Sequence, residues 1–511
     1  MTGAAIRTVD PRPTPLKARR LGIDTHQEAV VYMRQDCPVC RSEGFAAHAR
    51  VQIAGPGGVV VATLEVVTSD LLDHDEAGLS EAAWRRLGVR QGDDLLVTHP
   101  PALESLSHVR AKIYGQRLGR AALRMIVDDI ANGRYADVHL AAFVTAGAGH
   151  ALDVEEMVAL TEAMVAAGRR LDWGDRPVAD KHSVGGLPGN RTTPIVVAIV
   201  AACGLTIPKT SSRAITSPAG TADTMETLAP VDLDLTAMRR VVDKEGGCLV
   251  WGGAVDLSPA DDVLIRVERA LDLDSEGQLV ASVLSKKIAA GATHVLIDMP
   301  VGPTAKVRSQ PEADRLTGAL RAVGASAGLQ LRVVQTDGTQ PVGSGIGPAL
   351  EARDVVRVLQ NAPDASPALR TKSVVLAGAL LELLGHAAAG AGQATADAVL
   401  RDGRAWRKFA AICAAQGGLR EPPRAAYTHP VVATRSGRVE RIDNRVLARI
   451  AKLAGAPSDK AAGLELHTPL GGRVDRGQPL FTLHAETRGA LAYALEYAGR
   501  HADVIQIGAD A

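Results

Sequence analysis

The chain has few aromatic side chains and no net charge. Phe, Trp and Tyr together make up 3% of the 511 residues, although 46% of the residues are hydrophobic. Aliphatic side chains and alanine must therefore fill the core. The 57 Lys and Arg residues balance the 57 Asp and Glu residues. This balance gives no support to binding of nucleic acid or of an anionic membrane surface.

Long hydrophobic runs and a secretory leader are also missing. The first residues read MTGAAIRTVDPRPTPLKARRLGID and contain no apolar segment. The longest apolar run is interrupted after about a dozen residues, which is short of the ~20 that a membrane-spanning helix needs. Five cysteines do not make a disulfide framework. We therefore expect a cytoplasmic protein.

One pair of cysteines has the CxxC spacing, Cys37-Pro-Val-Cys40. A zinc site would need two further thiolate or imidazole ligands at suitable spacing, and the chain has no second CxxC. Small buried cysteines, or cysteines in a turn, are therefore favoured over a metal or redox site. We expect no bound metal.

The hydrophobic pattern predicts several domains of different kinds. After about 20 loose residues, short strands up to residue 100 predict an N-terminal, mostly β domain. Residues 105–170 carry apolar positions at three- and four-residue steps and predict a helical bundle. Alternating strands and helices over residues 175–420 predict a large mixed α/β domain, and residues 428–505 predict a C-terminal α+β domain.

Residues 180–229 organise the chain. Two polar, glycine-rich segments, DKHSVGGLPGNRTT and KTSSRAITSPAGTADT, bracket the apolar run Ile195–Leu205. Glycine lets the backbone approach a ligand, whereas hydroxyls, helix N-termini and cationic side chains suit anions. The pattern favours an oxyanion site, most simply for phosphate, over two ordinary polar loops around a buried helix. The glycines of Gly343–Gly347 do not have the spacing of a dinucleotide fingerprint and predict a loop or turn.

Longer strings within this stretch resemble the thymidine phosphorylase and pyrimidine-nucleoside phosphorylase family. They are Asp180-Lys-His-Ser183 followed by Gly-Gly, Gly189-Asn-Arg-Thr-Thr193, and Lys209–Asp223. The similarity is greatest to the AMP phosphorylases and the type 2 thymidine phosphorylases. Further matches are Ser258–Asp262, Ser282–Lys287 and Pro348–Glu351. The resemblance covers nearly the whole chain.

The resemblance implies a pentosyltransferase that cleaves an N-glycosidic bond with phosphate, releasing the free base and a ribose or deoxyribose 1-phosphate. Phosphate is then a co-substrate, and no cofactor is implied. The implied fold is a helical domain, residues 105–170 plus about 260–290, hinged to an α/β domain, residues 175–255 plus 290–420. The implied partners are a small nucleoside or nucleotide and phosphate, in a homodimer or larger homo-oligomer, without nucleic acid or membrane.

The resemblance also assigns roles to individual residues. Lys181, His182 near the base, and Asp274 as proton donor are the catalytic residues that it implies. The phosphate-binding residues are Lys181, Ser183, Thr193, Ser211 and Thr221. The substrate-binding residues are Gly186, Ser212, Arg213, Ala214, Ile215, Thr216, Ser217, Thr221, Ser282, Lys286 and Lys306.

The base-binding region departs from the pyrimidine pattern. Where those enzymes clamp the base with an arginine, the register offers Val267 or Glu268, and Pro300 replaces a lysine. Arg191 and Arg213 either contact the 5′-phosphate of a nucleotide or are structural salt-bridge partners. Three hypotheses stay open: a phosphorylase of AMP-like nucleoside monophosphates or nucleosides, thymidine phosphorylase proper, and a non-catalytic nucleotide-binding protein.

Overall fold

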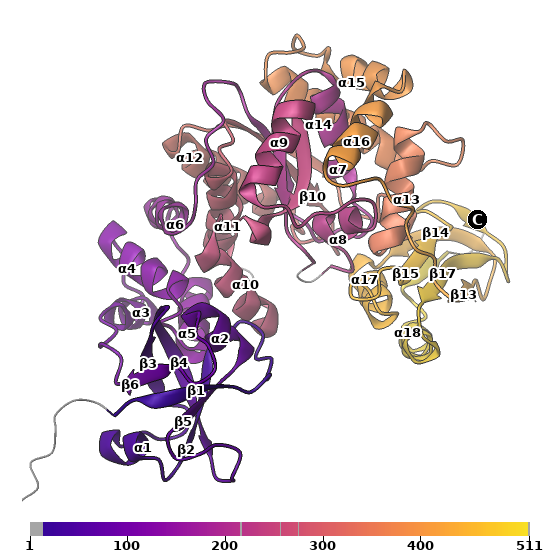
Figure 1. Cartoon of the computed structure of the whole chain (residues 1–511). Helices are drawn as coiled ribbons and strands as arrows, with labels where there is room; N and C mark the ends of the chain where they lie inside the picture. The colour runs from indigo at the N-terminus through magenta and orange to yellow at the C-terminus, as the bar shows by residue number, and fades with distance from the viewer. Residues whose placement is uncertain (1–13, 215–216, 256, 274, 509–511) are drawn as a thin grey trace, which may run out of the picture. The chain divides into compact units, whose positions relative to one another are not determined.

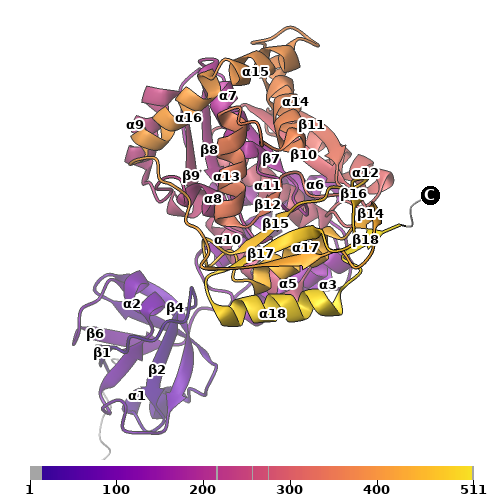
Figure 2. The same cartoon turned by 90° about the vertical axis from the view of Figure 1, so that its right-hand side faces the viewer.

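The structure is a computed structural model that describes residues 14–214, 217–255, 257–273 and 275–508. The chain forms two compact units, Met1–His150 and Ala151–Ala511. Within the described residues, no helix is both long enough and apolar enough to cross a membrane. Figures 1 and 2 show the elements of each unit.

A closed β-barrel forms most of the first unit, with strand order β1-β5-β2-β4-β3-β6. The sequence predicted a loose segment up to about residue 20, but Leu16–Arg20 is strand β1, which pairs with both β5 and β6. This prediction was wrong because Leu16 and Ala18 alternate with charged residues and fill the barrel core. The other strands are β2 (Val30–Arg34), β3 (Arg50–Gly55), β4 (Gly58–Val67), β5 (Glu76–Leu79) and β6 (Asp94–Thr98).

Two short helices accompany the barrel, α1 (Pro38–Glu43) and α2 (Glu81–Leu87). The thiol of Cys37 caps α1, since its Sγ accepts the backbone N–H of Cys40 at 3.2 Å. Both thiols are buried. In the described part of the chain, no group of three or more His, Cys, Asp or Glu side chains is arranged to hold a metal ion.

The helices of the predicted helical domain fall in both units. The first unit contains α3 (Ser105–Ile113), α4 (Arg120–Ala131) and α5 (Asp137–Gly149). The second contains α6 (Val154–Ala167), α10 (Pro259–Leu271) and α11 (Glu276–Ala289). The start of helix α11 packs closely against the segment before α6. A Cβ added to Gly277 would lie only 2.8 Å from the side chain of Leu152.

Parallel strands form the centre of the second unit. Strands β7 (Ala179–Ser183), β10 (His294–Val301) and β11 (Gln330–Asp337) make a sheet in the order β11-β10-β7. Strand β8 (Ile207–Ser211) pairs with β9 (Gly247–Trp251), and a parallel bridge from Val178 to Thr206 joins the two sheets. The carboxyl ends of these strands therefore share one edge, which is where open α/β sheets bind ligands.

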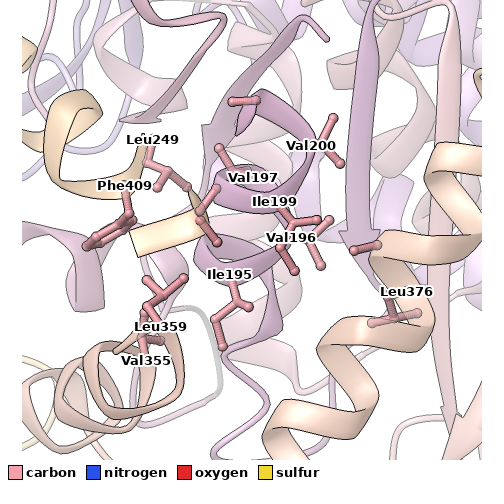
Figure 3. Packing of buried hydrophobic residues seen from close by; sticks show 14 of the residues in the cluster. Ile195, Val196, Val197, Ile199, Val200, Leu249, Val355, Leu359, Leu376 and Phe409 are labelled. Carbon is pink, nitrogen blue, oxygen red and sulfur yellow. The ribbon is translucent and has the colours of Figure 1, made fainter. Parts of the chain in front are cut away.

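Helix α7 (Thr192–Ala202) runs through the core between the sheet and other helices. Figure 3 shows its side chains Ile195, Val196 and Ile199 among residues from surrounding elements. Because it is apolar on all sides, the helix is buried on all sides, as its sequence predicts. The helices that pack against it are α8 (Thr221–Glu226), α13 (Pro348–Leu359), α14 (Pro367–Leu383), α15 (Gly392–Arg401) and α16 (Arg404–Ala415). The second unit also contains α9 (Leu235–Glu245) and α12 (Gln310–Ser326).

The C-terminal region forms two small sheets and two helices. One sheet has the order β12-β15-β17-β13 and the other β16-β14-β18. Strands β13 and β14 follow one another in the chain but lie in different sheets. Strand β12 comes from the loop before α13, far earlier in the chain. The bounds are β12 (Gly345–Ile346), β13 (Tyr427–Val432), β14 (Gly437–Ile442), α17 (Asn444–Leu453), β15 (Gly463–Leu466), β16 (Arg473–Val474), β17 (Pro479–Ala485), α18 (Arg488–Arg500) and β18 (Ile505–Ile507).

Candidate active site

Strand β7 separates two polar clusters. Because side chains alternate along a strand, Lys181 and Ser183 lie on one face, and Asp180 and His182 on the other. The first pair contacts Asp298 of β10. Asp180 contacts lysines of other elements. The four-residue motif thus contributes to both clusters.

The first cluster is centred on the carboxylate of Asp298, which is fully buried. Its Oδ2 accepts hydrogen bonds from Ser183 and from Asn190, both at 3.0 Å. Its Oδ1 accepts one from Thr336 at 2.7 Å and lies 3.3 Å from the ammonium of Lys372. Burial would raise the pKa of Asp298, but the charges of Lys181 and Lys372 outweigh it and lower the pKa.

Lys181 belongs to the same cluster and is fully buried. Its Nζ donates to the hydroxyls of Thr192 at 2.8 Å and Thr193 at 3.3 Å, and lies 3.8 Å from Asp298. Burial lowers the pKa of Lys181 to about 8, against the opposing effect of Asp298. Three of the predicted phosphate-binding residues, Lys181, Ser183 and Thr193, are thus brought together at the start of α7. Helix N-termini favour anions.

The second cluster is centred on Asp180. Its Oδ1 lies 3.1 Å from Nζ of Lys209, and its Oδ2 lies 2.8 Å from Nζ of Lys287. All three side chains are buried. Burial, opposed by Asp180 and reinforced by the charge of Lys209, lowers the pKa of Lys287. One carboxylate therefore forms ion pairs with two ammonium groups.

The glycine loop after β7 makes a close backbone approach to the segment after β10. A Cβ on Gly186 would lie 2.2 Å from the backbone nitrogen of Lys306, whereas nothing lies within 4 Å of the same position on Gly185. Both glycines have positive φ. Gly186 and Lys306, two predicted substrate-binding residues, are therefore in direct contact.

This pair of glycines offers a matched test. We expect Gly185→Ala to lower the free energy of unfolding by about 1 kcal/mol, because an L-residue with positive φ is strained. Gly186→Ala should cost about 1–3 kcal/mol more, because its methyl group must displace the backbone at Lys306. Guanidinium denaturation measures both. Equal losses of unfolding free energy in the two variants would show that the backbone contact between Gly186 and Lys306 is not rigid.

A carboxylate at the start of α8 holds the loop that follows β8. Asp223 of α8 accepts the backbone N–H groups of Ala214 at 2.7 Å and Gly220 at 2.9 Å. The hydroxyl of Ser217 donates to the carbonyl of Ala219 at 2.9 Å. Ser212 is exposed. The buried hydroxyl of Ser211, at the end of β8, has no hydrogen-bond partner among the described residues, which leaves it available to a ligand.

Arg191 and Arg213 are both paired with carboxylates. Arg191 lies 2.6 Å from Glu351 and donates to the hydroxyl of Thr221 at 2.8 Å. Arg213 pairs with Glu226 through two hydrogen bonds of 2.8 and 2.9 Å, and its guanidinium lies 4.9 Å from the ring centroid of Trp251. Of the two alternatives, these contacts favour structural salt bridges over binding of a 5′-phosphate.

The other predicted residues lie on α11 or outside the described part. Ser282 and Lys286 are four residues apart on α11 and both half-buried, and Lys286 pairs with the buried Asp261. Burial alone would lower the pKa of Lys286, but Asp261 helps to raise it. Asp274, Ile215 and Thr216 lie outside the residues that the structure describes.

The sequence predictions did not include several polar residues of the two clusters. Asp298 lies inside the apolar string HVLIDMPV of β10, and a carboxylate within a buried strand is a signal that could have been used. Lys209 lies in one of the strings that resemble the family, but the resemblance assigns no role to it. Lys372 lies in the interior of α14 and offers no local signal. Its contact with Asp298 joins distant parts of the chain.

Comparisons with known proteins agree with this architecture. Residues 107–168 match the helical bundle domain of a glycosyl transferase family, and residues 175–406 match its a/b domain. Residues 438–502 match the C-terminal domain of pyrimidine nucleoside phosphorylases. The chain therefore has the multidomain α/β organisation of these glycosyl transferases.

Whole-chain relatives narrow the assignment. A protein of Polaromonas sp. (strain JS666 / ATCC BAA-500) named "Putative thymidine phosphorylase" is 65% identical over 98% of both chains. "Putative thymidine phosphorylase 2" of Acidovorax sp. (strain JS42) is 63% identical over 96% of both. The chain belongs to the thymidine phosphorylase and pyrimidine-nucleoside phosphorylase family, which confirms the resemblance. A solved anthranilate phosphoribosyltransferase from Thermus thermophilus is 20% identical, with a TM-score of 0.49 over 60% of this chain and 98% of that chain.

Proposed function

We infer that this protein is a glycosyltransferase that cleaves the N-glycosidic bond of a nucleoside with phosphate. Membership of the family supports the reaction class. The observation that carries the inference is the Asp298 cluster, which places Lys181 and Ser183 at the start of α7 and the carboxyl end of β7. An ammonium, hydroxyls and helix N–H groups together suit a phosphate dianion.

Phosphorolysis needs a bound phosphate on one side of the sugar and a proton for the base on the other. Phosphate contacts the hydroxyls of Ser183, Thr193 and Ser211, and it replaces a threonine as a partner of Lys181. One phosphate oxygen then forms a bond to the anomeric carbon of the sugar. The C–N bond breaks, and its electron pair leaves with the base. A proton supplied to the base neutralises that pair.

The residues that serve the base are proposed from the resemblance. Asp274 supplies the proton, and His182, Ser282, Lys286 and Lys306 contact the nucleoside. We propose that the helical domain, residues 105–170 and about 260–290, moves about hinges during turnover. We also propose that the protein works as a homodimer or larger homo-oligomer in the cytoplasm, with no cofactor beyond phosphate.

Two sets of residues bear on the choice of substrate, and they point in different directions. The departures at Val267 and Pro300 argue against the pyrimidine clamp, whereas the ion pairs of Arg191 and Arg213 remove two candidate partners for a 5′-phosphate. On the resemblance to AMP phosphorylases, we still propose a nucleoside 5′-monophosphate of the AMP type or a nucleoside as substrate. Thymidine is the alternative, which the names of the relatives support.

Purified full-length protein incubated with phosphate and AMP, CMP, UMP, thymidine or uridine tests this proposal. We expect release of free base and a sugar 1-phosphate from at least one of them, and none when phosphate is omitted. Cleavage of thymidine with inert monophosphates would exclude the nucleotide substrate. No turnover of a wide nucleoside and nucleotide panel would favour the non-catalytic binding protein.

A further inference from the structure

The Asp180 cluster, formed by Asp180, Lys209 and Lys287, joins three elements beneath the candidate site. Asp180 lies on β7, Lys209 on β8 and Lys287 on α11. The exposed fractions of the three side chains are 2%, 5% and 3%. Removing such charges from water is costly unless they pair. The two ion pairs therefore fix α11, with Ser282 and Lys286, to the strands that carry His182 and Ser211.

The charges of this cluster do not cancel. Burial lowers the pKa of Lys287 to about 7, so below that pH both lysines are protonated and one carboxylate faces two ammonium groups, which leaves a net positive charge buried beside β7. His182 follows Asp180 by two residues and lies on the same face of β7. Among the described residues, its ring makes no hydrogen bond or ion pair, which leaves both nitrogens available to a substrate.

Other charged groups around His182 are also mainly cationic. Burial and the charges of neighbouring lysines hold the pKa of His182 well below its usual value. The cations are Lys287, Lys209, Lys181 and Lys286, and the carboxylates paired with them are Asp180, Asp298 and Asp261.

We propose that the Asp180 cluster is a positioning element of the site, which keeps the His182 ring neutral, so that His182 meets the departing base as a hydrogen-bond donor and not as an imidazolium acid. Lys209 and Lys287 act through His182 and touch no substrate. This role rests on the proposed phosphorolysis. A neutral imidazole can still stabilise negative charge that develops on the base, while the proton comes from elsewhere.

Charge-changing variants of Lys209 test the proposal. Lys209→Met removes one positive charge at nearly constant volume and leaves Asp180 paired with Lys287. Removing a nearby cation favours the imidazolium form. The titration midpoint of His182, followed by NMR of the ring and assigned with His182→Gln, should therefore rise by about one pH unit. The acid limb of the kcat/KM profile should move to higher pH by the same amount.

Two further variants separate charge from packing. Lys209→Arg retains the charge and should leave both midpoints in place. Lys408→Met, which removes a lysine of α16 that pairs with Glu245 of α9, should also leave them in place. If Lys209→Met does not fold, Lys287→Met makes the same prediction. An unchanged midpoint in the folded Met variant, or an equal shift in the Arg variant, would overturn the proposal. The NMR titration needs no turnover, so failure of the proposed function is distinguishable.

Discussion

Lys181→Met is expected to reduce phosphorolysis by roughly 10³-fold, which is the order of loss when a charged or hydrogen-bonding group that stabilises a transition state is removed. The buried ammonium is surrounded by Thr192, Thr193 and Asp298, at the start of α7. Without it, phosphate loses its cationic partner at this position. Initial rates over a range of phosphate concentrations measure the loss in kcat and in kcat/KM.

Lys372→Met is the matched control for this prediction. Lys372 also pairs with Asp298, at 3.3 Å, but is not among the residues predicted to bind phosphate. Both variants remove one ammonium from the same carboxylate, so their thermal stabilities should fall by comparable amounts. We expect Lys372→Met to retain much more activity. Equal losses of activity would show that Lys181 acts only by holding Asp298 in place.

Asp298→Asn is expected to give the largest loss of stability, about 3–5 kcal/mol or a failure to fold. The substitution keeps the shape of the side chain but leaves the buried ammonium groups of Lys181 and Lys372 without a counter-charge. Guanidinium denaturation at pH 7 measures the effect. Asp243→Asn, which breaks a surface pair with Arg176, should cost less than about 1 kcal/mol.

The contribution of Asp298 to the stability of the fold changes with pH in a definite direction. Because the pKa of Asp298 is lowered in the folded protein, its carboxylate stabilises the fold above the pKa of the unfolded chain. This contribution is lost as the pH falls through the folded pKa. Asp298→Asn should therefore weaken the dependence of stability on acidic pH. Similar stability and pH dependence in Asp298→Asn and wild type would contradict the arrangement of charges described for the cluster.

Local sequence patterns predicted much of the secondary structure and part of the site. The all-apolar run of α7 is a buried helix, and the string GCLVW is strand β9. Strand β1 was missed because two charged positions and a proline-rich approach conceal the alternation of Leu16 and Ala18. Short strands are recognised by their pairing as much as by their own residues, and that pairing is not local.

Long-range contacts explain what the sequence could not predict about the site. The motif from Asp180 to Ser183 shows which residue types are present, but not that alternate side chains contact different lysines. Lys372 and Asp298 meet only because α14 packs beside β10. For Arg191 and Arg213, the sequence left two alternatives, and partners as distant as Glu351 favour one of them.

The pairing of β12 with β15 means that the last segment of the chain is not a detachable module. Strand β12 is flanked by the glycine loop at Gly343, which donates to the carbonyl of Gly189, and Lys460 pairs with Glu226 at 2.7 Å. A chain truncated before β13 would leave β12 as an unpaired edge and Ile346 exposed to solvent. Such a truncation should disturb the loops predicted to bind phosphate as well as the terminus, so the C-terminal segment is part of the scaffold of the candidate site.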